Sequence, residues 1–262
     1  MYDFAFHKPS SVADAVAALG MDESKALAGG QTFIPVLKQR LNKPSAIIDL
    51  HGLGLVGITA TASTITVGAM TTHAEVMSNK DILARIPGLA KMASWIGDTQ
   101  VRHRGTMGGS LANNDPSACY PAAVLALGAT IVTDKRRIPA DEYFQGMFTT
   151  ALAQDELITA IEFPIPEKSN YEKFRNPASR YAMVGVFVAK GPAGVRVAIT
   201  GAGQDGVFRQ TAMEQALAAT WSADAIAGIV TPADGLNSDI HAGAEYRAHL
   251  IGVMAKRAVA GV

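Results

Sequence analysis

The amino-acid sequence predicts an α+β fold with at least two domains. Segments with apolar residues at helical spacing alternate with short apolar runs that are typical of strands. The chain has 262 residues, which is more than one average domain of about 150 residues. Two prolines, Pro164 and Pro166, mark a boundary between two such stretches. These three observations favour separate units of mixed structure, with divisions at about 1–57, 58–166 and 170–262.

The first unit, up to about residue 57, is expected to begin with a helix. Ser11 stands before apolar residues at helical spacing, and Gly20 ends the pattern. A second helix tolerates Pro35 only because this proline lies in its first turn. The other elements expected here are a strand at 24–28, that second helix at 32–41, and a strand at 46–50.

The second unit is expected to open with a strand at 64–69. Thr72 and Glu75 form a capping box, which predicts the start of a helix. The stretch 103–121 is rich in Gly, Asn, Ser and Pro and is expected to be a loop. The remaining elements expected are helices at 82–95, broken at Pro87-Gly88, and at 122–127, and strands at 129–133 and 157–163.

The third unit is expected to combine two strands with three helices. Its strands are predicted at 182–189 and 195–200, and its helices at 211–220, 222–230 and 242–259. Residues 201–206 fit the pattern G-x-G-x-x-G, which in nucleotide-binding folds must be followed by a helix. Here Val207-Phe208-Arg209 follows instead, so we interpret this motif as a structural turn.

Charge and composition exclude several classes of protein. The chain has 23 Lys and Arg and 23 Asp and Glu residues, so it lacks the basic excess typical of nucleic-acid binding. No apolar run reaches about 18 residues, so no membrane span is expected. The N-terminal residues lack the basic and apolar parts of a signal peptide, which makes the cytoplasm the expected location.

Cysteine and histidine usage bears on metal chemistry. Cys119 is the chain's single cysteine, so no internal disulfide, cysteine-rich zinc site or iron–sulfur cluster is expected within it. The six histidines form no close pair with metal-ligand spacing, and no metal site is predicted. Any redox carrier would therefore be organic, or would sit on a partner. Cys119 could be a nucleophile only with a nearby base, and the sequence around it supplies none. The alternative interpretation is that Cys119 is a buried thiol without a chemical role.

Two glycine-rich segments are the candidate binding loops. In residues 28–32, two adjacent glycines between a strand and a helix could turn backbone N–H groups toward a phosphate; the alternative is a plain turn capped by Thr32. Residues 105–116 hold a second Gly-Gly pair among Thr, Ser and Asn side chains, which could bind a diphosphate or a polyol, or form only a surface loop. Together they favour a bulky phosphorylated ligand between two lobes.

These two segments, together with further motifs, make the chain resemble a known family, the FAD-binding medium subunit of the molybdenum hydroxylases. This is the group of aerobic carbon monoxide dehydrogenase and of the flavin domain of xanthine dehydrogenase. The resemblance rests on residues 28–35 and 106–112, on Asp115-Pro116, and on residues 68–76 and 246–250, in the family's order over essentially the whole chain.

The resemblance implies a fold of the vanillyl-alcohol oxidase and xanthine dehydrogenase flavin type. Two lobes, at about 1–57 and 58–166, would enclose FAD, and a smaller α+β domain at 170–262 would follow. The backbone of 29–33 and 106–110 would hold the pyrophosphate. Ile96 and Ile158 would lie near the adenine, and Lys173 and Tyr181 near the flavin. The residues implied to bind FAD are Ala28, Gly29, Gly30, Gln31, Thr32, Phe33, Ile96, Thr106, Met107, Gly108, Gly109, Ser110, Asp115, Cys119, Ile158, Lys173 and Tyr181.

One position departs from the family pattern. The family often has an acid three residues after the Asp-Pro pair, where this chain has Cys119. A thiol is a weaker hydrogen-bond partner than a carboxylate, so a contact of that acid with the ribityl chain or the flavin would be weakened. Asp115 is a candidate to compensate.

The function implied by the resemblance is electron transfer within a multi-subunit molybdenum hydroxylase. A large subunit would hold the molybdenum cofactor, a small subunit would relay electrons through 2Fe–2S clusters to FAD, and the assembly would be a dimer of heterotrimers. No side chain of this chain need be a catalytic acid or base. A stand-alone flavin oxidase or reductase is the alternative, and a non-enzymatic nucleotide-binding scaffold is a third hypothesis.

Overall fold

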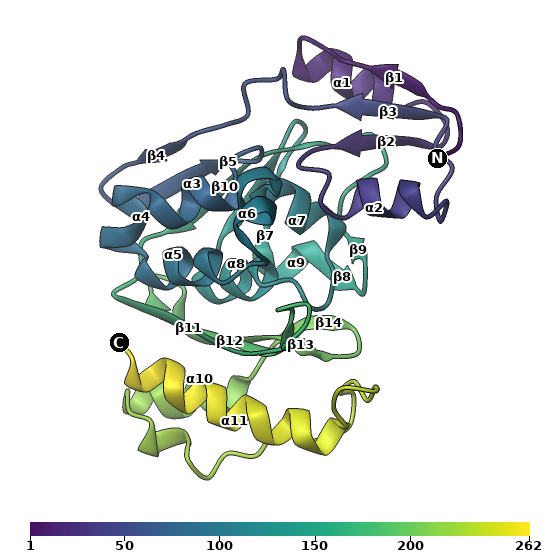
Figure 1. The fold of residues 1–262 in the computed structure, drawn as a ribbon. Coiled ribbons are helices and arrows are strands. Elements are labelled where there is room, and N and C mark those ends of the chain that lie inside the picture. Colours follow the sequence, from purple (N-terminus) through teal and green to yellow (C-terminus); the bar gives the residue numbers. More distant parts are fainter.

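The computed structural model describes residues 1–262, and its strands form three larger sheets and a two-stranded ribbon. The first sheet, at one end of the molecule (Figure 1), comes from the N-terminal unit. Its elements are β1 (Ala5–His7), α1 (Val12–Leu19), β2 (Ser24–Leu27), α2 (Phe33–Lys38) and β3 (Ala46–Asp49). The strand order is β1-β3-β2, and both outer strands run parallel to β3. Parallel neighbours need crossover connections, and α1 and α2 lie in them.

The second sheet has five strands in the order β4-β5-β10-β6-β7. They are β4 (Ile58–Ala60), β5 (Thr64–Gly68), β6 (Thr130–Thr133), β7 (Arg137–Pro139) and β10 (Ile158–Pro164). All neighbours are antiparallel. The late strand β10 lies between β5 and β6, so it joins the two ends of a long helical insertion into one sheet.

The insertion between β5 and β6 consists of the short helices α3 (His73–Ser78), α4 (Lys80–Arg85), α5 (Pro87–Ser94), α6 (Thr99–Arg104), α7 (Met107–Asn113) and α8 (Tyr120–Leu127). A further short helix, α9 (Ala140–Tyr143), and a small ribbon of β8 (Phe144–Gly146) and β9 (Thr149–Thr150) lie between β7 and β10. The predicted capping box is confirmed, because Thr72 and Glu75 exchange side-chain and backbone hydrogen bonds at the start of α3. Every residue of α8 is buried, and α8 occupies the centre of the molecule.

The third sheet has the order β11-β12-β13-β14 and is antiparallel throughout. Its elements are β11 (Lys168–Arg175), β12 (Ala182–Gly191), β13 (Gly194–Gly203) and β14 (Gly206–Arg209), followed by α10 (Thr211–Ala219), a 3-10 helix η1 (Asp224–Ile226) and α11 (Ala244–Ala260). The helices α5 and α8 pack on one face of this sheet, and α10 and α11 cover the other (Figure 1).

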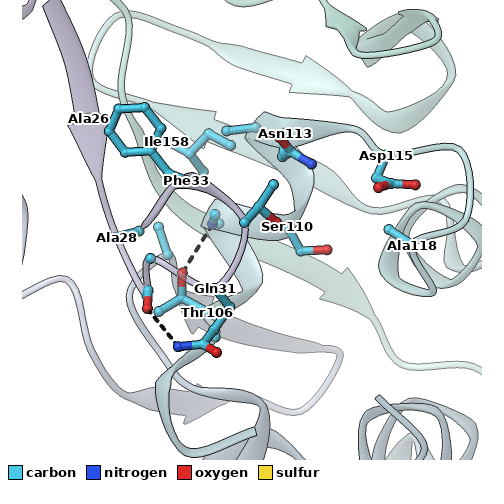
Figure 2. A pocket seen from close by; sticks show the side chains of 18 of the residues that line it. Ala26, Ala28, Gln31, Phe33, Thr106, Ser110, Asn113, Asp115, Ala118 and Ile158 are labelled. Carbon is cyan, nitrogen blue, oxygen red and sulfur yellow. Dashed lines mark hydrogen bonds between the residues drawn. The ribbon is translucent and has the colours of Figure 1, made fainter. Parts of the chain in front are cut away.

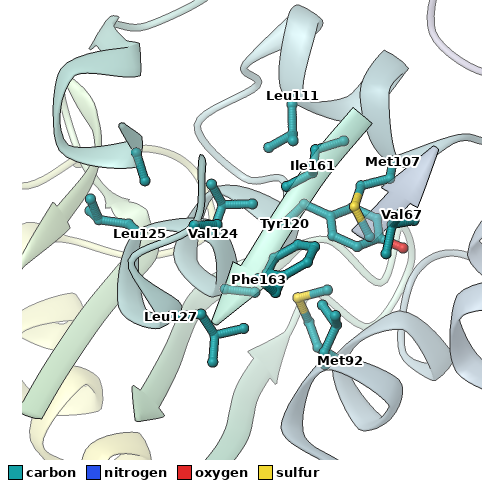
Figure 3. Close-up of a cluster of buried hydrophobic side chains, with 14 of the residues drawn as sticks. Val67, Met92, Met107, Leu111, Tyr120, Val124, Leu125, Leu127, Ile161 and Phe163 are labelled. Atoms are coloured by element: carbon teal, nitrogen blue, oxygen red, sulfur yellow. The ribbon is translucent and has the colours of Figure 1, made fainter. Parts of the chain in front are cut away.

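Alternation along β12 explains why almost all of this strand is buried. Successive side chains of a strand point to opposite faces. Val184, Val186 and Val188 belong to the apolar cluster under α10 and α11, whereas Phe187 and Ala189 belong to the large central core. Figure 3 shows part of that central core, where side chains from several helices and from β10 meet. The central core therefore continues into the third sheet.

Two predictions about secondary structure are wrong. The stretch 103–121 is not a loop: it holds the end of α6, all of α7 and the start of α8. The Thr106 hydroxyl accepts a hydrogen bond from the Gly109 N–H, and Met107 and Leu111 are fully buried. Capping and burial thus outweigh the low helix propensity of glycine.

The second error concerns the predicted helix at 222–230. Only the three residues of η1 are helical, Ile226 is the one buried residue of 222–230, and Gly228 follows. One buried side chain gives a helix little to pack against. The interpretation of residues 201–206 as a structural turn is confirmed, because Gly203 and Gly206 pair across the β13–β14 hairpin. No helix of the chain is both long and apolar enough to cross a membrane.

Candidate functional site

A cleft of about 840 Å³ lies where the N-terminal unit meets the helical insertion. This volume is in the range of about 300–1,000 Å³ that is common for small-molecule and cofactor sites. Side chains from residues 26–33 and from residues 106–118 surround the same space (Figure 2). All of the residues predicted to bind a cofactor line this cleft except Met107, whose side chain is in the central core.

The first glycine-rich loop offers free hydrogen-bond donors to the cleft. None of the backbone N–H groups of residues 29–32 donates a hydrogen bond within the chain. Gly29 is buried, where such groups are nearly always paired, whereas Gln31 and Thr32 are exposed. Gly30 has a φ of 72°, a left-handed conformation that glycine adopts readily. The Gln31 side chain donates to the Gly29 carbonyl oxygen at 3.3 Å and braces the turn. Successive N–H groups of this kind suit an anion.

The second glycine-rich segment was expected to hold a pyrophosphate through its backbone, but its N–H groups are already used within the chain. Its backbone N–H groups have partners within the chain: Met107 donates to the Thr71 carbonyl at 3.1 Å, Gly108 to that of Ala69 at 2.8 Å, and Ser110 to that of Thr106 at 3.1 Å. This segment presents to the cleft its glycine surface and the side chains of Thr106, Ser110, Asn113 and Asp115 (Figure 2).

The glycines bring the two segments into contact. A Cβ atom on Gly29 would lie 2.1 Å from the Arg104 carbonyl oxygen, and one on Gly109 would lie 3.3 Å from Ala28 Cβ. A Cβ atom on Gly108 would lie 2.6 Å from Ala69 Cβ. These close approaches are possible only without side chains. They form one continuous wall from segments about 75 residues apart in the sequence.

A buried lysine joins three further segments at the wall of the cleft. Lys173 on β11 is 7% exposed. Its Nζ donates to the carbonyl oxygens of Trp95 at 2.8 Å and Arg180 at 3.0 Å, and lies 3.4 Å from the Cys119 sulfur. It thereby links the end of α5, the β11–β12 turn and the start of α8. Tyr181, in the same turn, lines the cleft and is half exposed.

His73 is a cleft residue that sequence reasoning missed. It is the first residue of α3, is 5% exposed, and its Nδ1 has no hydrogen-bond partner. Burial, together with the charge of Arg102, lowers the pKa of His73 to about 4, so the ring is neutral at neutral pH. The capping box locates His73 on a helix, but no local pattern shows that α3 borders the cleft.

Residues 2–166 match the family described as the FAD binding domain in molybdopterin dehydrogenase. The carbon monoxide dehydrogenase medium chain of Hydrogenophaga pseudoflava is 33% identical over 98% of this chain and 96% of its own length. The chain belongs to this FAD-binding family. The family resemblance inferred from the sequence is thereby confirmed.

Solved structures of relatives agree with the family assignment and with the predicted α+β class. Reconstituted carbon monoxide dehydrogenase from Oligotropha carboxidovorans matches with a TM-score of 0.90 and 32% identity, over 99% of this chain and 97% of that one. Quinoline 2-oxidoreductase from Pseudomonas putida 86 matches with a TM-score of 0.88 and 27% identity, over 99% and 96%.

The cleft fits the FAD that this family binds. Its volume accommodates a dinucleotide, and the unpaired N–H groups of residues 29–32 match the needs of a diphosphate. Apolar side chains at Phe33, Ile96 and Ile158 offer surface to an aromatic ring. No group of three or more His, Cys, Asp or Glu side chains is arranged to hold a metal ion.

Proposed function

We propose that this chain is the FAD-binding electron-transfer subunit of a multi-subunit molybdenum hydroxylase. One observation carries the proposal: two glycine-rich segments meet at one cleft, and the first presents a run of unpaired backbone N–H groups to it. FAD supplies the redox chemistry when bound. The chain's own groups bind and orient it, and none of them need act as an acid or base.

Within this proposal, the family resemblance suggests a role for each of the residues that line the cleft. Residues 29–32 hold the diphosphate through their N–H groups, and Thr106 to Ser110 close against it from the other side. Ile96 and Ile158 offer apolar surface to the adenine. Asp115, Cys119, Lys173 and Tyr181 surround the flavin end. In this proposal residues 1–166 form the FAD-binding domain, with lobes at about 1–57 and 58–166, and residues 170–262 form the C-terminal α+β domain.

The partners are a large subunit with the molybdenum cofactor and a small iron–sulfur subunit, assembled as a dimer of heterotrimers in the cytoplasm. Family membership and the near full-length match to a carbon monoxide dehydrogenase medium chain support these partners. The chain's composition adds an independent reason. With Cys119 as its one cysteine, it cannot ligate an iron–sulfur cluster that needs several thiolates, so the electron relay must come from another chain.

The decisive experiment is a gentle affinity purification of this chain from its native host. The visible spectrum, the iron and molybdenum contents and the co-purifying chains are recorded together. We expect a flavin spectrum, both metals and two further subunits. A yellow protein without metals or partners would contradict the proposal in favour of a stand-alone flavoenzyme. A colourless single chain that stays colourless after addition of FAD would contradict both.

A further inference from the structure

Lys173 places a positive charge at the wall of the cleft without a negative partner. The three N–H groups of its ammonium match three acceptors, the Trp95 and Arg180 carbonyl oxygens and the Cys119 sulfur. No carboxylate lies within ion-pair distance of its Nζ. Ten ion pairs form elsewhere in the chain, and none of them includes Lys173. Buried charges are normally paired, so this one is unusual.

Neither neighbouring acid pairs with Lys173. Glu172, next to Lys173 on β11, pairs with Lys91 at 2.7 Å. Asp115 lines the cleft, but its Oδ1 accepts the Ser117 N–H at 2.8 Å and it forms no ion pair. The group that reaches the ammonium from α8 is the thiol of Cys119, which is itself 5% exposed. Residue 119 therefore decides whether the charge of Lys173 is balanced.

We propose that Lys173 and Cys119 together set the reduction potential of the bound cofactor, with the unbalanced ammonium raising it. This inference rests on the proposed function, because it concerns FAD held in the same cleft. Reduction adds electrons and so adds negative charge to the cofactor. A nearby positive charge in a poorly solvated site stabilises that reduced form. A carboxylate at position 119 would neutralise the ammonium and remove this stabilisation.

The test compares the wild-type chain with Cys119→Asp and with Cys119→Asn. The two variants have nearly the same shape and differ in charge. Residue 119 precedes α8 with a φ of −81° and a ψ of −38° and makes no side-chain capping hydrogen bond, and its sulfur lies 3.4 Å from Lys173 Nζ. The FAD content of each protein is measured first. The midpoint potential of the bound FAD is then measured by equilibration with redox dyes of known potential.

We expect Cys119→Asp to shift the midpoint potential to a more negative value and Cys119→Asn to leave it near the wild-type value. Lys173→Gln removes the charge directly and keeps donors for the Trp95 and Arg180 carbonyl groups, so it should shift the potential in the same direction. The Lys173→Gln variant also tests the inference if the Cys119→Asp variant does not fold.

Two negative results are distinguishable. If the wild-type chain binds no FAD, the proposed function fails before any potential is measured. If FAD binds, but Cys119→Asp and Cys119→Asn give the same potential and Lys173→Gln gives the wild-type value, the inference about the potential is wrong while the proposed function stands.

Discussion

His73 makes the stability of the protein sensitive to mild acid. Burial lowers the pKa of this side chain to about 4 in the folded chain, whereas an unfolded chain protonates it near its ordinary value of 6.5. Between these values the unfolded state binds the extra proton. The contribution of His73 to stability is therefore fully present above pH 6.5 and is lost as the pH falls toward 4.

We expect His73→Gln to flatten this part of the stability profile. The free energy of unfolding, measured by urea titration at several pH values, should lose a slope of up to about 1.4 kcal/mol per pH unit. The matched control is His249→Gln, because His249 is exposed on α11 and makes no side-chain hydrogen bond. Equal slopes in wild type and His73→Gln would refute the prediction.

Cys119 allows occupancy of the cleft to be followed without mutation. It is the chain's only thiol and lines the cleft, so any thiol reagent reports on this one position. We expect FAD to slow its alkylation in the folded protein, because the ligand fills the route to the sulfur. Labelling is followed by intact mass, with urea-unfolded protein as the control that must label once and show no effect of FAD. Equal rates with and without FAD in the folded protein would place the ligand elsewhere.

At the scale of residues, the two Gly-Gly pairs led to the prediction that distant segments bind one ligand. Both pairs line one cleft, although the second lies in helix α7 and not in a loop, and the binding itself stays a prediction. The contacts of Lys173 could not be predicted from local pattern, because its partners Trp95 and Cys119 are 78 and 54 residues away. Resemblance to the family suggested the lysine, but only the fold reveals that it has no acidic partner.

At the scale of elements, glycine has opposite roles in the loop before α2 and in α11. A Cβ atom on Gly29 would meet the Arg104 carbonyl oxygen, whereas one on Gly252, inside α11, would meet no atom within 4 Å. Gly29→Ala should cost about 1–3 kcal/mol through overpacking and weaken FAD binding. Gly252→Ala should instead stabilise the chain by about 1 kcal/mol. Thermal unfolding and FAD titration of both variants check this.

Two results would contradict the role assigned to Gly29. If Gly29→Ala binds FAD as tightly as Gly252→Ala and unfolds at the same temperature, the close approach of the two glycine-rich segments is not required. If Gly29→Ala unfolds early but binds FAD as tightly as Gly252→Ala, the approach matters for folding alone.

Elements were predictable where burial and periodicity agreed. The strand at 182–189 was found because both of its faces are buried and it reads as a continuous apolar run. The strand β11 was missed because it mixes Lys, Ser, Asn and Glu with aromatic residues. Its polar side chains find specific partners, as when Asn170 donates to the Ala258 carbonyl oxygen at 2.8 Å. Such pairings across the fold leave no local signal.

For the whole molecule, the distribution of apolar contacts predicts uneven stability. The central core has 32 buried residues, whereas the cluster at the N-terminal unit has seven, of which Met70 and Leu157 come from the second unit. Local opening requires less free energy where fewer apolar contacts are lost. We expect amide hydrogens of β3 to exchange faster than those of β10, although each is an inner strand of its sheet.

Hydrogen exchange with mass-spectrometric detection measures this difference. FAD should slow exchange in β3 more than in β10, because the N-terminal unit supplies one wall of the cleft. As an internal reference, β12 has core clusters on both faces and should exchange slowly with or without FAD. Equal protection of β3 and β10 in the free protein would mean that the N-terminal unit unfolds only together with the rest.

The walls of the cleft come from separated parts of the chain between Leu19 and Tyr181, with the largest groups of lining residues within 24–36, 105–119, 148–158 and 173–181. A ribosome adds about 5–20 residues per second, so the first wall emerges on the order of ten seconds before the last. During that interval no complete pocket exists. Cofactor insertion therefore has to wait until residues 173–181 have been made, and a message truncated before the codon for Tyr181 lacks part of the cleft wall.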